Sequence, residues 1–248
     1  MKRPAISLVI AAALTLILWV MPFGSVLALP LLWLSTLAHE LGHGLAAILV
    51  GGSFDALQIF FDGSGVASCR YDKSAQPWVS LGGLLGPALV AMFLFVAGVL
   101  QRPARAILGG AGLVSLGLCV TVIDGAFALS FALLLGLFLL AWAWQASAPA
   151  AQVTVLFLAV QLSLSVFSSS DYLFVATART GAGEMPSDIA QVATHFGGPI
   201  LFWGAVVAAF SVLVLVAGIV LFAWGDALHA RLTSWQRRRQ GQQMPSGL

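Results

Sequence analysis

Seven long, nearly uninterrupted runs of apolar residues restrict what this chain can fold into. They lie at about 5–21, 29–50, 78–100, 105–123, 126–146, 151–168 and 199–224. A helix of about 20 apolar residues crosses the roughly 30 Å hydrocarbon core of a bilayer. In lipid every backbone amide must be paired within the protein, so continuous runs of this length indicate transmembrane helices.

The composition supports the same class of protein. Charged residues make up 8% of the 248 residues and hydrophobic residues 60%, whereas a soluble domain carries roughly 25% charged residues. So few charges cannot cover a surface that faces water, which excludes an ordinary soluble domain. We therefore predict an all-α polytopic bundle of about 6–8 transmembrane helices in the cell membrane, built as a single domain over residues 1–248.

Two polar insertions interrupt the apolar pattern. The first has two short β-prone runs around Asp62-Gly63-Ser64-Gly65 and predicts a small β-hairpin insertion at about 54–72. Its exposed strand edge would hold an extended peptide by strand addition, or the hairpin would lie on the surface without contacting a substrate. The second insertion, about 169–198, predicts a polar loop with one short amphipathic helix.

Basic residues flank the first and the last apolar run. Lys2 and Arg3 precede the first, and four arginines in a basic tail at 231–248 follow the last. The positive-inside rule therefore places both ends in the cytoplasm, and we expect the tail to contact anionic lipid and not nucleic acid. Seven crossings would put the ends on opposite faces, so one run is re-entrant, or 169–198 adds a crossing, or the tail is an exception to the rule.

The first 28 residues also have the outline of a signal peptide, with two basic residues, an apolar stretch and small residues near Ala28. However, a second apolar run begins almost at once, and Pro22 and Gly24 are typical of a turn. We therefore expect an uncleaved first helix.

A cluster of ionisable residues lies inside the second apolar run, in His39-Glu40-Leu41-Gly42-His43. Helical spacing of four residues places His39 and His43 on one face, where two imidazole nitrogens can bind one zinc ion at about 2.0–2.1 Å. Glu40 beside them can take a proton from zinc-bound water. Because ionisable residues in hydrocarbon are costly and usually functional, we predict a Zn²⁺ site with Glu40 as the catalytic base of amide hydrolysis.

A catalytic zinc site needs a third protein ligand and an open position for water. Asp124 is the first candidate, because it ends the fourth apolar run, which crosses the bilayer in the same direction as the second. A helix-ending Asp-Gly turn would also explain it. Asp171, at the end of the sixth run, is the next candidate. Asp188 and His195 are weaker candidates, because a polar residue in an aqueous loop needs no special explanation.

Gly82 and Gly86 lie four residues apart in the third apolar run. Small residues at this spacing let membrane helices approach closely, since packing drives helix association in lipid. We expect this face to contact the helix that carries His39 and His43. Pro87 would kink the same helix and free a backbone carbonyl.

The chain resembles the site-2-protease superfamily of intramembrane zinc metalloproteases, and within it the compact bacterial metallopeptidase-like branch. The similar segments are His39 to Gly44, Gly51-Gly52, Asp62 to Val66, Gly82 to Pro87, Ser187-Asp188 and Pro199 with Trp203. The resemblance implies zinc on His39 and His43, with Glu40 as catalytic base. It also implies an Asp-Gly pair as third ligand on a later helix, which Asp124 matches, although Asn and Pro do not precede it here.

Two functions are consistent with these features. One is an intramembrane zinc endopeptidase that hydrolyses a peptide bond in or near a transmembrane segment of a partner protein. The other is a proteolytically inactive zinc-binding membrane protein with a regulatory or binding role. Metal transport would need several intramembrane ligands along a path, and the sequence has one cluster. We expect a membrane-protein substrate and the lipid bilayer as partners.

Overall fold

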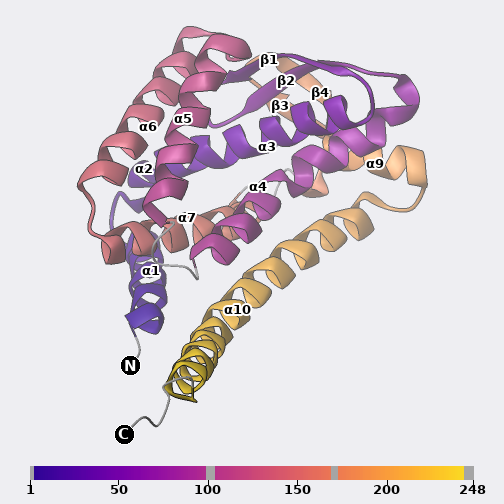
Figure 1. Ribbon diagram of the computed structural model, residues 1–248. Coiled ribbons are helices and arrows are strands. Elements are labelled where there is room, and N and C mark those ends of the chain that lie inside the picture. Colours follow the sequence, from indigo (N-terminus) through magenta and orange to yellow (C-terminus); the bar gives the residue numbers. More distant parts are fainter. Residues whose placement is uncertain (1–2, 99–103, 169–172, 243–248) are drawn as a thin grey trace, which may run out of the picture.

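The computed structural model describes residues 3–98, 104–168 and 173–242 as a helical bundle with two small hairpins (Figure 1). The helices are α1 (Arg3–Val20), α2 (Gly24–Leu27), α3 (Leu29–Leu49), α4 (Gln76–Gly98), α5 (Ala104–Thr121), α6 (Ala126–Gln145), α7 (Ala148–Ser168), α9 (Asp188–Phe196) and α10 (Ile200–Gln242), with a 3₁₀ turn η1 (Lys73–Ala75). The strands are β1 (Ser53–Ile59), β2 (Gly65–Arg70), β3 (Thr177–Thr180) and β4 (Gly183–Pro186). The predicted all-α membrane bundle with a β-hairpin insertion is confirmed.

Five of the described helices are long and apolar enough to cross a membrane. They are Lys73–Gly98, Ala104–Thr121, Ala126–Gln145, Ala148–Phe167 and Ile200–Phe222. The first predicted span contributes only a shorter apolar helix, Ile6–Leu18. The second predicted span is α3, whose mean hydropathy is lowered by His39, Glu40 and His43, and it is not among the five.

Hydrogen bonds between side chains join α1 to α7. The Ser7 hydroxyl donates to Gln152 Oε1 at 3.1 Å, and Gln161 donates its amide to Thr15 Oγ1 at 3.2 Å. The Gln152 amide also donates to the carbonyl of Gly98, the last residue of α4, at 2.8 Å. Polar groups of this kind hold helices together in lipid, where no hydrophobic force drives association. Because residue numbers rise together in these pairs, α1 runs parallel to α7.

Close contacts between small residues join α3 to α4, as the glycine spacing predicts. A Cβ on Gly42 would lie 2.2 Å from the carbonyl oxygen of Gly82, and one on Gly86 would lie 2.5 Å from that of Ala38. The pairing shows that α3 and α4 are antiparallel. Since α4 ends at Gly98 beside the start of α7, α4 is antiparallel to α7 as well.

The first two long helices, α1 and α3, therefore point in the same direction, toward the end of the bundle that carries the hairpins. The turn between them uses Phe23 with φ of 69° and packs Gly24 on the backbone of Leu18. The start of α1 and the end of α10 lie together at the opposite end (Figure 1). The first two apolar runs were expected to cross the membrane in opposite directions. In the structure their helices, α1 and α3, run in the same direction instead.

The two outer edges of the first hairpin have different neighbours. The outer edge of β1 is hydrogen-bonded to the link between α5 and α6, and the outer edge of β2 faces α3. In the β1–β2 register Leu57 pairs with Ala67. On the outer edge, the Leu57 N–H donates to Val122 at 2.7 Å and its carbonyl accepts from Asp124 at 2.8 Å. The link between α5 and α6 thus covers β1, and β2 is turned toward the helix of His39.

The second polar insertion contains more structure than predicted. The expected short amphipathic helix is α9, but β3 and β4 form a second antiparallel hairpin before it. Its turn meets the turn of the first hairpin, where Gly181 N–H donates to Ser64 Oγ at 3.0 Å. The two hairpins therefore lie together over one end of the bundle.

Replacing Gly42 by Ala is expected to destabilise the protein by about 1–3 kcal/mol, because the added methyl would force α3 away from the Gly82 carbonyl. Thermal unfolding in detergent measures the effect. Gly110→Ala on α5 is the matched control, since a Cβ there meets no atom within 4 Å, and alanine is the better helix former. Equal melting temperatures for the two variants would contradict the close packing of α3 on α4.

Candidate metal centre

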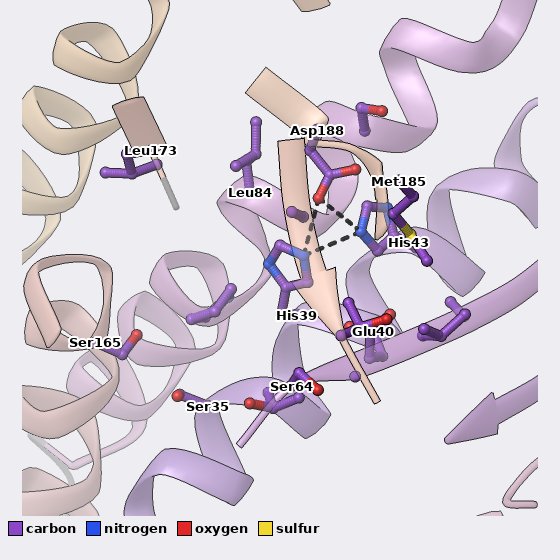
Figure 2. A pocket seen from close by; sticks show the side chains of 18 of the residues that line it. Ser35, His39, Glu40, His43, Ser64, Leu84, Ser165, Leu173, Met185 and Asp188 are labelled. Atoms are coloured by element: carbon purple, nitrogen blue, oxygen red, sulfur yellow. Dashed lines mark hydrogen bonds and ion pairs between the residues drawn. The ribbon is translucent and has the colours of Figure 1, made fainter. Parts of the chain in front are cut away.

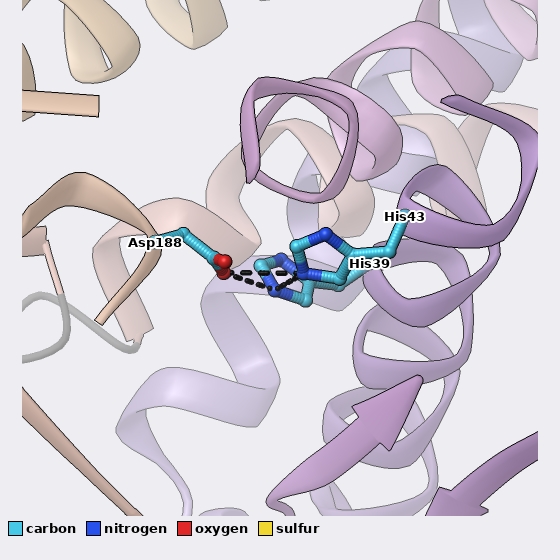
Figure 3. Close-up of side chains that lie close together, drawn as sticks. All are labelled: His39, His43 and Asp188. Atoms are coloured by element: carbon cyan, nitrogen blue, oxygen red, sulfur yellow. Dashed lines mark hydrogen bonds and ion pairs between the residues drawn. The ribbon is translucent and has the colours of Figure 1, made fainter. Parts of the chain in front are cut away.

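His39 and His43 project from one face of α3, one helical turn apart (Figure 3). Their Nε2 atoms are 3.1 Å apart, and both residues are partly buried. The Nδ1 of His43 lies 2.8 Å from the carbonyl oxygen of Val79 on α4. A proton on Nδ1 donates to that carbonyl and leaves Nε2 with a free lone pair, the usual arrangement of a metal-binding imidazole.

The third side chain of the cluster is Asp188, at the start of α9. Its Oδ2 lies 3.1 Å from His39 Nε2 and 3.2 Å from His43 Nε2, and the residue is 6% exposed. Ligands arranged tetrahedrally at 2.0–2.1 Å around one zinc ion are roughly 3.3 Å apart. The three donor atoms thus fit three corners of a tetrahedral metal site, with the fourth left for water. No other such group is found in the described part of the chain.

Local sequence explains why α9 begins at Asp188. The Ser187 side chain caps the helix by accepting from the N–H of Ala190 at 3.2 Å, and its hydroxyl donates to the carbonyl of Val175 at 2.6 Å. The apolar face of α9 then packs into the bundle through Ile189 and Val192, both fully buried. These contacts hold the first turn of α9 against α4 and α10, which places the Asp188 carboxylate beside the two histidines of α3.

A chain of hydrogen bonds also holds α9 in place. The Tyr71 hydroxyl donates to Gln76 Oε1 at 3.1 Å, and the Gln76 amide donates to the side chain of Gln191, one turn after Asp188. Gln191 in turn donates to the Pro186 carbonyl at 3.1 Å. The chain connects the end of the first hairpin, α4, α9 and β4, so it fixes the element that supplies Asp188.

Asp124, the expected third ligand, does not lie in this cluster, and Asp188 lies in its place beside the two histidines. Its exposed carboxylate accepts from Gln58 Nε2 at 2.7 Å, and its backbone is bonded to the outer edge of β1. The end of α5 does reach the hairpin end of the bundle, but the hairpin separates it from α3. His195 is also elsewhere, with its ring 5.0 Å from that of Phe196. Asp171 lies outside the described residues.

Glu40 lies beside the two histidines and is 5% exposed. Its carboxylate accepts a backbone hydrogen bond from Ala67 on β2. A Cβ on Gly65 would lie 2.7 Å from Glu40 Oε1, so glycine at that position gives the carboxylate room. The edge of β2 that faces α3 thus positions the predicted base.

These residues line one cavity of about 560 Å³ between α3, α4, α7, α9, α10 and both hairpins (Figure 2). Its wall is mixed, with polar groups such as Ser35, Ser64 and Ser165 and apolar groups such as Leu84, Leu173 and Met185. A cavity of this size has room for a short peptide segment together with water, to which the serine hydroxyls offer hydrogen-bond partners.

Asp188 and Cys69 both line the hairpin side of the cavity, and their pKa values are shifted in opposite directions. Burial opposes ionisation of Asp188, but the neighbouring His43 and His39 hold the pKa of its carboxyl well below the usual range. Asp188 is therefore an anion, the form that binds a metal. Burial raises the pKa of the Cys69 thiol to about 11, helped by the negative charges of Asp55 and Glu40. Cys69 is thus a neutral thiol at physiological pH and is not part of the three-residue cluster.

Comparison with known proteins matched the chain to a protein family. A family model described as peptidase M50B-like matches residues 7–218, most of the chain. The matched region includes α3 with His39, Glu40 and His43 and also reaches Asp188 on α9. Neither the curated proteins nor the solved structures gave a match.

Replacing Asp188 by Ala is expected to abolish stoichiometric metal binding, because two imidazoles alone leave the coordination sphere incomplete. Asp124→Ala is the matched control and should retain the metal of the wild type, since its carboxylate bonds Gln58. Metal content after purification measures both. Full metal in the Asp188 variant together with its loss in the Asp124 variant would contradict the site built here.

Proposed function

The chain belongs to the peptidase M50B-like family, and on that premise we propose that it is an intramembrane zinc endopeptidase. Its substrate is a membrane protein, hydrolysed at a peptide bond in or near a transmembrane segment. The observation that carries the proposal is the convergence of His39, His43 and Asp188 within 3.1–3.2 Å of one another, with the buried carboxylate of Glu40 alongside.

The three converging side chains would hold the zinc ion. When bound, zinc polarises a peptide carbonyl and lowers the pKa of a bound water toward neutrality. The chain's own contribution is orientation. Val79 fixes the ring of His43 through Nδ1, and the Gln76–Gln191 contact fixes the helix of Asp188. Such supporting contacts typically govern metal affinity by 10- to 100-fold.

Glu40 is the general base in this proposal. It follows His39 directly, so it lies at the cluster without being one of the three donors. Its carboxylate takes the proton of the attacking water and delivers it to the leaving amine. The hydrogen bond from Ala67 holds the carboxylate in place. The same bond ties the base to the strand along which a substrate would lie.

An extended substrate would lie along the edge of β2 that is not paired with β1. The outer edge of β1 is already covered through Leu57, so strand addition on the first hairpin is restricted to β2. Gly65, Val66 and Ala67 of that strand line the cavity with Glu40. A peptide bonded to this edge would present its backbone to the base and the metal. This supports a substrate-holding role for the hairpin over that of a plain surface element.

Access to the site is expected to be lateral, from the bilayer. The five candidate spans and the family match support a membrane protein, and we propose a multi-pass protein of the cell membrane. Many apolar side chains on the helix exteriors are exposed, among them Val120, Leu134 and Leu213 at 85%, 67% and 63%. Lipid covers such a surface, and a membrane-protein substrate reaches the cavity within the same layer.

Replacing Glu40 by Gln is expected to leave zinc bound and to lower the rate of substrate cleavage by about 10²–10⁴-fold, since an amide cannot accept the proton. Cleavage of a membrane-protein substrate in liposomes, with zinc content measured in parallel, tests this. Glu184→Gln is the control, because that carboxylate is exposed and pairs only with Arg179. Undiminished cleavage by zinc-loaded Glu40→Gln would exclude the proposed mechanism, and a zinc-loaded wild type that cleaves no membrane protein would favour the inactive zinc-binding role.

A further inference from the structure

The charged residues of the chain are divided between the two ends of the bundle. The hairpin end, which carries the candidate metal centre, has the basic residues Arg70, Lys73 and Arg179 among the described residues. Most described acidic residues lie at the same end, in the hairpins, in the α5–α6 link and on α9. They are Asp55, Asp62, Asp72, Asp124, Glu184 and Asp188.

The opposite end is basic. Arg3 begins α1, Arg105 lies in the first turn of α5, and Arg231 with Arg237 to Arg239 lie in the last turns of α10. Asp226 is the acidic residue of that distal part of α10. Arg105 donates to the Ala143 carbonyl at 2.9 Å and so covers the end of α6. The arginines of α10 follow the last candidate span, which ends at Phe222, within the distance over which basic residues orient a helix.

The direction of the helices places both chain ends on the basic side. α1 and α3 together lead from the basic end to the hairpins, α4 and α6 return, and α5 and α7 run back toward the hairpins. α10 then returns to the basic end, where the first turn of α1 also lies (Figure 1). If α1 and α3 together make one passage, the passages of α4, α5, α6, α7 and α10 bring the number of crossings to six. An even number of crossings leaves both basic chain ends on the same side of the membrane, as the positive-inside rule requires.

We infer that the candidate metal centre opens on the extracytoplasmic side of the membrane. Lys and Arg are retained on the cytoplasmic side of membrane proteins, which makes the α1 and α10 ends cytoplasmic and the hairpin end extracytoplasmic. The orientation itself does not depend on the proposed function, but its consequence for a substrate rests on that function. If the chain is a protease, it cuts the extracytoplasmic end of its substrate's transmembrane segment.

The depth of the centre agrees with this assignment. His43 bonds Val79, six residues after the hairpin-side start of the candidate span Lys73–Gly98. At 1.5 Å per residue the centre lies roughly 10 Å along that span from the hairpin side and roughly 30 Å from its other end. Asp188 lies on α9, outside the five candidate spans. Water and the extended part of a substrate therefore reach the centre from the hairpin side.

Cysteine labelling in intact cells tests the inference. The two native cysteines, Cys69 and Cys119, are replaced by Ser. A single cysteine is then introduced by Ala182→Cys in the turn of the second hairpin or by Gln242→Cys at the end of α10. A membrane-impermeant maleimide is applied before and after permeabilisation. We expect the cysteine at 182 to be labelled in intact cells and the cysteine at 242 only after permeabilisation.

Every other pattern overturns the inference, including labelling of both sites or of neither site in intact cells. Glu184→Cys gives a second reporter on the same hairpin if the first variant fails to accumulate, and unchanged zinc content shows that each variant is folded. Labelling does not depend on cleavage. An inactive but correctly labelled protein would therefore refute the protease proposal alone, and an active protein with reversed labelling would refute only the orientation.

Discussion

The convergence of His39, His43 and Asp188 is the interaction on which the rest of the structure depends. Two of these residues lie on a helix inside an apolar bundle, and the third lies on a short helix almost 150 residues later in the chain. Bringing a carboxylate to two imidazoles in a poorly hydrated site is costly unless the charges are paired or bound to a metal. The surrounding contacts are those expected of a site that must hold three donors at fixed separations.

Those contacts start with the close approach of α3 and α4. Gly42, Gly82 and Gly86 let the two backbones meet, and this brings the Val79 carbonyl to the ring of His43. A Cβ on Gly83 would lie 2.2 Å from the same ring. A glycine pattern typical of helix packing in membranes therefore also positions the ring of His43, one of the three proposed metal ligands.

The sequence predicted the parts of the fold that depend on local pattern. The apolar runs predicted the helical bundle, and the Asp-Gly-rich turn predicted the first hairpin. The spacing of His39 and His43 predicted two of the three side chains that converge in the candidate metal centre. It did not predict the third, because helix direction fixes depth in the membrane but not lateral neighbours. Asp124 follows a helix that runs in the same direction as α3, but it lies on the outer edge of β1. Asp188 lies in a polar segment, where an acidic residue is unremarkable, and its similarity to the family at Ser187-Asp188 was the available signal.

The most direct measurement is zinc K-edge X-ray absorption of the purified protein in detergent. A site formed by two imidazoles, one carboxylate and water predicts only nitrogen and oxygen neighbours, at about 2.0–2.1 Å, with multiple scattering from two histidine rings. A sulfur neighbour at about 2.3 Å, which the Cys69 thiol of the same cavity would supply, or the signal of a single histidine, would contradict the proposed coordination.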